Sequence, residues 1–181
     1  MSILEIRRHS FRKEGGGSQL SQSGVDHARG IGATIGPFAR VVTSVVPRAR
    51  ETAIAMGFAV DYEIITMSAD PAVYDEAQAL RWWEAAQPFE ALAELALGGG
   101  PFGLYAHSLA ALWRDVMTPL PMDAAALFIG HSGQLEAGLV ACYPDADHAA
   151  WGKGFAACEG ARLRFEGDPA YFQSLEVLRL T

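Results

Sequence analysis

The chain has 181 residues, about the length of one domain, and half of its residues are hydrophobic, which is enough for a sizeable core. Its net charge of −7 disfavours general binding of nucleic acids or acidic membranes, because both of these ligands require a basic face. We therefore expect a single domain over residues 1–181 that binds neither nucleic acid nor membrane.

The two cysteines, Cys142 and Cys158, form no C-x-x-C motif and no dense disulfide framework. This usage favours a reducing compartment. The first ten residues lead directly into a strand pattern, without the basic and apolar regions of a signal peptide, and no window reaches about 18 consecutive apolar residues. The sequence therefore predicts a soluble, cytoplasmic protein.

Predicted strands and helices alternate along most of the chain. The predicted strands cover residues 3–8, 40–44, 60–66 and 124–130, with two more within 161–167 and 172–180. The predicted helices cover residues 20–36, with Ser21 as the N-cap, and then 48–57, 80–97, 104–117 and 133–143. This alternation indicates an α/β fold, a three-layer α/β/α sandwich with a mainly parallel sheet. The last two strands are expected to be antiparallel at an edge.

Two of the predicted strands end in histidines. Arg8 and His9 end the first one, in ILEIRRHSFRK, and His131 follows the fourth, in ALFIGHSG. In open α/β sheets, ligands bind outside the carboxyl ends of the strands. We therefore expect these residues to share one pocket, although they lie far apart in the sequence.

Three arginines accompany these histidines: Arg8, Arg12 and, at the start of the second predicted helix, Arg48. Guanidinium groups bind phosphate through paired hydrogen bonds, so two or three of them around one pocket would clamp an oxyanion. Their charge would lower the pKa of a nearby imidazole below about 6.5 and keep it neutral. A neutral imidazole can attack phosphorus, and a second one can donate hydrogen bonds to the phosphoryl oxygens.

Four segments, RRHSFRK, LSQSGVDHARGIG, TSVVPRARETA and LFIGHSGQLEAGL, together resemble the histidine phosphatase superfamily, which includes cofactor-dependent phosphoglycerate mutases and phosphohistidine phosphatases. Their order and spacing match over residues 3–140. The resemblance implies a phosphoglycerate mutase-like fold with His9 as the phosphorylated nucleophile. It also implies that Arg8, Arg12, Arg48 and His131 complete the phosphate pocket.

The sequence departs from the family pattern in two places. Ser10 replaces the usual glycine after the histidine and is expected to narrow the site, because a side chain occupies that position. The usual pattern around the general acid is missing. Counting from the RARETA helix, Asp70 is the nearest carboxylate, with Asp75 and Glu76 as alternatives. Small phosphohistidine phosphatases are similar to this chain in the SADP segment, and a phosphoramidate leaving group depends less on a carboxylic acid.

Other side chains receive weaker interpretations. Arg7 and Lys13 are expected to be solvated neighbours of the site, and Trp82 and Trp83 are expected to serve packing or surface cover. A zinc site made of His9, His131 and Asp70 is disfavoured, because metal-binding histidines usually come in close local pairs and the arginines would oppose a cation.

We predict a phosphatase that hydrolyses a phosphate monoester or a phosphohistidine, carried by a small molecule or a phosphoprotein, through a phosphohistidine on His9. No metal or organic cofactor is implied. Two alternatives remain: a mutase that returns the phosphate to a second hydroxyl group, and a catalytically silent module that binds phosphate. The oligomeric state is open, and a homodimer paired through an edge strand within residues 172–180 is one candidate.

Overall fold

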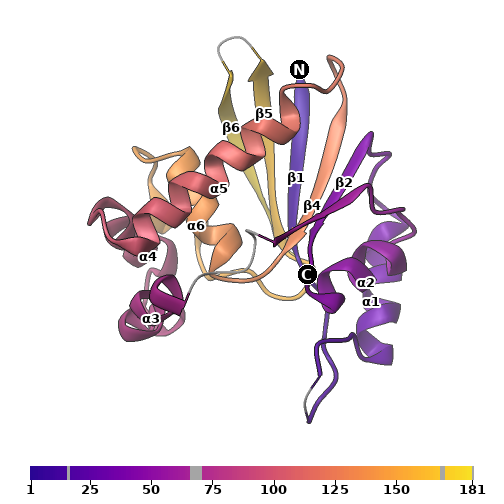
Figure 1. The fold of residues 1–181 in the computed structure, drawn as a ribbon, viewed down its shortest axis with the longest axis horizontal. Helices are drawn as coiled ribbons and strands as arrows, with labels where there is room; N and C mark the ends of the chain where they lie inside the picture. Colours follow the sequence, from indigo (N-terminus) through magenta and orange to yellow (C-terminus); the bar gives the residue numbers. More distant parts are fainter. Residues whose placement is uncertain (16, 66–70, 168–169, 181) are drawn as a thin grey trace.

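Six strands form one mixed sheet in the computed structural model, which describes residues 1–15, 17–65, 71–167 and 170–180 (Figure 1). In chain order they are β1 (Ser2–Arg8), β2 (Arg40–Ser44), β3 (Tyr62–Ile64), β4 (Ala125–Gly130), β5 (Gly160–Gly167) and β6 (Ala170–Leu178). Their order across the sheet is β3-β2-β4-β1-β5-β6. Strands β1 to β4 are parallel, whereas β5 and β6 pair in antiparallel fashion on one side, as predicted.

Helices cover both faces of this sheet. The α-helices are α1 (Gln22–Gly32), α2 (Pro47–Ala55), α3 (Pro71–Leu80), α4 (Pro88–Leu97), α5 (Pro101–Met117) and α6 (Gln134–Cys142). Two short 3-10 helices are η2 (Trp82–Glu84) and η3 (His148–Trp151). Helices α1 and α2 lie on one face and α3 to α6 on the other (Figure 1). This arrangement confirms the predicted three-layer α/β/α sandwich. Within the described residues, no helix has the length and hydropathy needed to cross a membrane.

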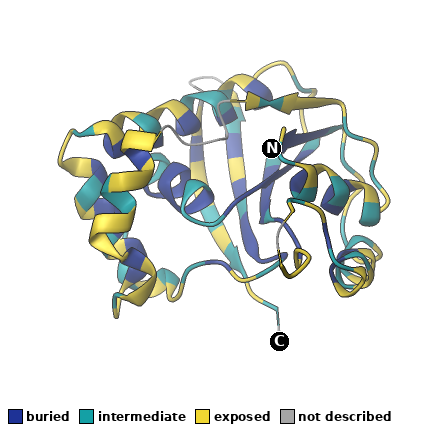
Figure 2. Cartoon of the chain, turned by 60° about the horizontal axis from the view of Figure 1, so that its bottom comes forward, coloured by how far each residue is buried: buried dark blue, intermediate teal, exposed yellow. Residues whose placement is uncertain are grey.

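Strand alternation divides the core into two parts, because successive side chains point to opposite faces of a sheet. On β4, Phe128 packs toward α5, where its ring lies 6.1 Å from that of Trp113. Its neighbours Leu127 and Ile129 belong to the other part, together with Ala53 of α2. Figure 2 shows the buried residues gathered in the central strands and on the inner sides of the helices. The sheet is therefore a rigid platform for the residues that follow its strands.

The helical prediction for residues 80–97 is partly wrong. A single helix was expected, but the chain forms the end of α3, then η2, then α4. Arg81 has a left-handed backbone with φ of 49°, which interrupts the helix, and Pro88 begins α4 because it lacks an N–H to continue an earlier helix. The third strand is also shorter than expected, since it pairs only with Val42–Ser44 of β2 at the edge of the sheet.

Three neighbouring strands end at the same edge of the sheet. Strand β4 lies between β1 and β2, and Arg8 pairs with Gly130 at the ends of β1 and β4. The backbone N–H of His9 donates to the carbonyl oxygen of Gly130 at 2.9 Å. Because the strands are parallel, the residues that follow them, including His9 and His131, meet above this edge.

Candidate active site

The imidazole of His9 is held in one tautomer. Its Nδ1 lies 2.7 Å from the backbone carbonyl oxygen of Ser10, an acceptor, so Nδ1 carries the proton. Its Nε2 lies 2.9 Å from Nε of Arg48, which can only donate. The hydrogen-bond network therefore assigns a neutral ring whose Nε2 presents a lone pair to the site.

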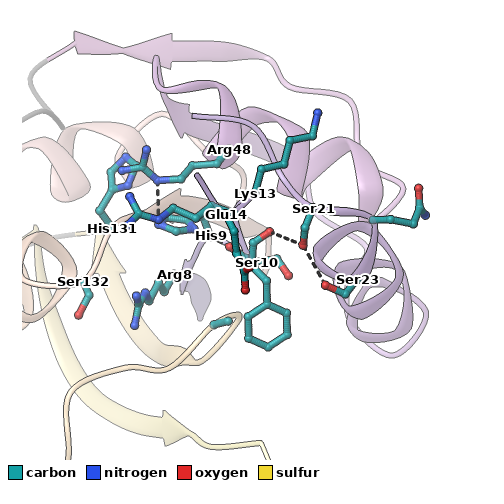
Figure 3. Close-up of a pocket in the computed structure, with 14 residues that line it drawn as sticks. Arg8, His9, Ser10, Lys13, Glu14, Ser21, Ser23, Arg48, His131 and Ser132 are labelled. Atoms are coloured by element: carbon teal, nitrogen blue, oxygen red, sulfur yellow. Dashed lines mark hydrogen bonds between the residues drawn. The ribbon is translucent and has the colours of Figure 1, made fainter. Parts of the chain in front are cut away.

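Two arginines reach the site from different elements. Arg48 lies in the first turn of α2, where Pro47 starts the helix, and it is half-buried. Arg8 ends β1, and its NH1 donates to the carbonyl oxygen of Phe155 at 2.6 Å. Its Nε is buried and has no hydrogen-bond partner within the described residues. The strand and the helix thus bring two guanidinium groups toward His9 (Figure 3).

His131 lies beside His9, with the two ring centroids 5.1 Å apart and the ring planes at 60°. Its Nε2 is 2.7 Å from Oγ of Ser44, which also accepts a hydrogen bond from the Val46 N–H. The proton of the Ser44 hydroxyl can be donated to Nε2, and in that arrangement the ring proton of His131 is on Nδ1. That Nδ1 is buried without a partner in the part of the chain that the structure describes. His131 thus has a donor left for another group.

Burial and positive charge keep both imidazoles neutral. Burial lowers the pKa of His9 from 6.5 to about 4; the hydrogen bond to Ser10 opposes this shift, and the charges of Arg48, Arg8 and Arg12 add to it. Burial, followed by the charges of Arg48, His9 and Arg8, lowers the pKa of His131 to about 3. Burial, followed by the charges of Arg12 and Arg8, also lowers the pKa of Arg48. At neutral pH, His9 is in the form that a nucleophile requires.

These shifts predict how stability depends on pH. Between pH 6.5 and about 4, the unfolded chain protonates His9 and His131 but the folded protein does not, so the free energy of unfolding should fall as the pH falls through this window. For His9, 8% exposed, the shift corresponds to about 3 kcal/mol. Denaturant unfolding at pH 7 and pH 4.5 measures the loss. Between these two pH values, the free energy of unfolding of His9→Asn should fall by less than that of the wild type. For His107→Asn, an exposed control, it should fall by as much as in the wild type. Equal losses in all three proteins would contradict the assignment.

The residues predicted from the strand ends line one cavity of about 1070 Å³. The structure brings together these five predicted residues: Arg8, His9, Arg12, Arg48 and His131. Figure 3 labels all of them except Arg12. Arg12 is exposed, in the segment after β1, together with Lys13 and Glu14, which also line the cavity. An anion in this cavity would therefore meet four positively charged side chains and one carboxylate.

The structure describes two of the three candidate acids, Asp75 and Glu76. Asp70 lies outside the described residues. Glu76 does not line the cavity, and its Oε2 accepts a hydrogen bond from the backbone N–H of Phe102 at 2.7 Å, which caps the start of α5. Asp75 is exposed on α3 and does not line the cavity. Among the described residues, no three His, Cys, Asp or Glu side chains are grouped as a metal site would require.

One expectation about a neighbour of the site needs correction. Arg7 is buried rather than solvated, and its Nε donates to Oε1 of Glu5 at 2.6 Å. Strand alternation places Arg7 and Arg8 on opposite faces of β1, so only Arg8 reaches the cavity. Ser10 is also fully buried, and its hydroxyl donates to the carbonyl oxygen of Gly24 at 2.8 Å. This hydroxyl ties the loop of His9 to α1.

Glu136 is a residue of the site that the sequence interpretation missed. It is fully buried, and its carboxylate accepts hydrogen bonds from the N–H groups of Gly133 at 2.6 Å and Phe155 at 2.8 Å. Burial raises its pKa, and these hydrogen bonds oppose the rise. Since the Phe155 carbonyl holds Arg8, Glu136 links the turn after His131 to the loop that holds Arg8. The available signal was its place in the first turn of α6, where a glutamate often caps the helix.

No protein-family model matches the sequence, and no curated protein matches it either. Solved structures do match over nearly the whole chain. One is phosphoserine phosphatase from Entamoeba histolytica in complex with 3-phosphoglyceric acid, with a TM-score of 0.68, 14% identity, and coverage of 100% of this chain and 98% of that chain. Another is mycobacterial glucosyl-3-phosphoglycerate phosphatase in complex with VO3, with a TM-score of 0.68, 19% identity, and 99% coverage of both chains. A third is the same mycobacterial enzyme with inorganic phosphate, at the same TM-score and identity, with 99% of this chain and 97% of that chain covered. The chain therefore has the α/β fold of these phosphatase structures.

Proposed function

We propose that this protein is a phosphatase that hydrolyses phosphate monoesters through a phosphohistidine intermediate on His9. The observation that carries the proposal is the neutral His9, whose unprotonated Nε2 lies 2.9 Å from the guanidinium of Arg48 in a cavity that it shares with Arg8 and His131. The similar structures support it, since they are phosphatases that bind 3-phosphoglyceric acid, VO3 or inorganic phosphate.

In the first step, Arg48 transfers its hydrogen bond from Nε2 of His9 to a phosphoryl oxygen, Nε2 attacks the phosphorus atom, and the bond from phosphorus to the ester oxygen breaks. Arg8, Arg48 and Arg12 hold the transferring oxygens, and Nδ1–H of His131 donates to one of them as negative charge develops. The imidazole of His9 becomes cationic, and its Nδ1–H bond to the Ser10 carbonyl stabilises this charge. In the second step, water attacks the phosphorus atom and gives a proton to the carboxylate that protonated the leaving oxygen. The bond from Nε2 to phosphorus breaks, which releases inorganic phosphate and restores neutral His9.

We assign protonation of the leaving oxygen to Asp70. It is the carboxylate that follows β3 most closely in the sequence, and the carboxylate of Glu76 already accepts a hydrogen bond at the start of α5. Replacing Asp70 with asparagine should slow hydrolysis of alkyl phosphates by roughly 10²-fold, because an alkoxide leaves poorly without a proton. Hydrolysis of p-nitrophenyl phosphate should change little, since p-nitrophenolate leaves unprotonated. Equal losses on both substrates, measured as kcat, would remove Asp70 from this role.

The substrate is a phosphorylated small molecule, or a phosphoprotein that carries a phosphoester or phosphohistidine. We propose a cytoplasmic location, which the free thiols of Cys142 and Cys158 support. The deciding experiment measures p-nitrophenyl phosphate turnover and vanadate binding by the purified protein. Turnover supports the phosphatase, whereas vanadate binding without turnover of this ester or of a phosphohistidine peptide identifies a silent phosphate-binding module.

A further inference from the structure

A second cavity, of about 560 Å³, adjoins the first. The two cavities share four lining residues: Arg8, Arg48, His131 and Ser132. Under the proposed function, Arg8, Arg48 and His131 hold the transferring phosphoryl group, which therefore lies where the cavities meet. The organic part of a substrate extends from this point, so the chemistry of each cavity indicates what kind of group it accepts.

The second cavity differs sharply from the first in charge. Apart from the four shared residues, its lining is apolar, aromatic, amide or glycine: Val46, Tyr74, Ala77, Gln78, Trp82, Trp83, Gly133 and Gln134. We call these eight residues the aromatic annex. The first cavity, by contrast, is lined by the charged side chains of Arg12, Lys13 and Glu14. A charged organic group would enter the annex without a charged partner, because the phosphate occupies Arg8 and Arg48, and such burial is costly.

The annex is fixed next to the phosphate residues by close packing. Trp82 is 6% exposed, and its indole ring lies 3.5 Å from the position that a Cβ atom on Gly133 would occupy and 2.8 Å from that position on Gly154. Any larger residue at Gly154 would collide with the ring, and Gly133 has φ of 85°, which favours glycine. The ring therefore packs against the turn that follows His131.

Two further aromatic side chains of the annex are open to solvent. Trp83 is 45% exposed and stands nearly perpendicular to Trp82, at 86° with the centroids 6.2 Å apart. Tyr74 of α3 is 58% exposed, and Gln78 lies one turn further along the same helix. Exposed aromatic groups beside a polar site are typical of surfaces that bind a ligand.

One polar atom in the annex has no partner. The Oε1 atom of Gln134, at the start of α6, is buried and makes no hydrogen bond within the described residues. Such an acceptor is costly to bury unless something donates to it. A ligand with an O–H or N–H on its ring would supply that donor.

We propose that the aromatic annex binds the leaving group, and that the preferred substrate is a phosphate monoester of an uncharged aromatic alcohol with a hydrogen-bond donor on its ring. This inference rests on the proposed phosphatase activity, because the activity places the phosphate and the inference adds only the direction in which the rest of the substrate extends. Trp83 and Tyr74 supply faces for stacking, Trp82 forms the wall beside His131, and Gln134 accepts the donor.

The test compares esters whose leaving groups are all primary alcohols, so that intrinsic reactivity is similar: 2-naphthylmethyl phosphate, its 6-hydroxy derivative, ethyl phosphate and phosphoserine. The wild type should show the highest kcat/KM on the hydroxynaphthyl ester. Trp83→Ala and Tyr74→Ala should each lower the ratio of naphthylmethyl to ethyl phosphate kcat/KM by about tenfold. Gln134→Leu should remove the advantage of the hydroxyl group. Tyr171→Ala, which replaces an exposed tyrosine on β6, is the matched control and should leave the ratio unchanged.

A binding measurement separates this inference from the activity. Naphthylmethylphosphonate has a carbon–phosphorus bond in place of the ester oxygen and tests the annex through quenching of tryptophan fluorescence, without turnover. If naphthylmethylphosphonate binds more tightly than ethylphosphonate, and Tyr74→Ala weakens its binding, the annex is supported even if no ester is hydrolysed. Absence of hydrolysis would then overturn only the proposed function. Equal binding of both phosphonates, or the highest kcat/KM on phosphoserine, would overturn the annex and place the leaving group in the charged cavity.

Discussion

Replacing His9 with alanine is expected to abolish both turnover and the formation of a phosphorylated protein. The neutral imidazole with Nε2 facing Arg48 is the nucleophile in the proposed mechanism, and alanine has no atom that can bond to phosphorus. Brief incubation with p-nitrophenyl phosphate, followed by rapid quenching at alkaline pH, should trap an adduct that is stable in alkali and labile in acid. Peptide mapping should locate it on the peptide that contains His9.

The matched control is His107→Ala, which removes an exposed histidine on α5. This variant should retain both the adduct and normal turnover. A label on His131, or normal turnover by His9→Ala, would show that the assignment of the nucleophile is wrong.

Replacing His131 with alanine should slow turnover by roughly 10²–10³-fold, the usual effect of losing one donor to the transition state. The structure leaves Nδ1 of this ring free of partners within the described residues, and Ser44 fixes the ring through Nε2 at 2.7 Å. Rapid-quench kinetics should show that the adduct on His9 still forms in His131→Ala, only more slowly. Ser44→Ala should cause a smaller loss, because the imidazole remains and loses only the partner that fixes its orientation and its tautomer. If His131→Ala stays within threefold of the wild-type kcat, or Ser44→Ala is the slower of the two, His131 is not the donor.

The residues of the cavity could be predicted from the sequence because their signals are local. Arg8, His9 and His131 directly follow apolar runs that form neighbouring parallel strands, and Arg48 follows the strand on the other side of β4. Once the sheet is parallel, its geometry brings these positions together. The helices on both faces could also be predicted, because the spacing of hydrophobic residues distinguishes helices from strands along most of the chain.

The remaining features depend on contacts between distant segments, which no local pattern contains. Glu76 was named as an alternative to Asp70, and no local pattern shows that its carboxylate binds the start of α5. The role of Glu136 depends on the backbone of Phe155 lying beside it. Trp82 was expected to serve packing or surface cover, and it does pack. Its partner is Gly133, in the turn that follows His131, so Trp82 also forms part of a cavity wall.

Glu136 also bears on how the site meets its ligand. The buried carboxylate of Glu136 binds the main-chain N–H groups of two loops, the turn after His131 and the loop that holds the Arg8 side chain. The distance between these two loops is therefore determined when the protein folds. The conformational entropy of these loops is then lost during folding and not during substrate capture, which favours affinity and correct orientation. The backbone around the site should accordingly be almost identical in the free and the phosphate-bound protein, and only the side chains of the exposed rim should rearrange.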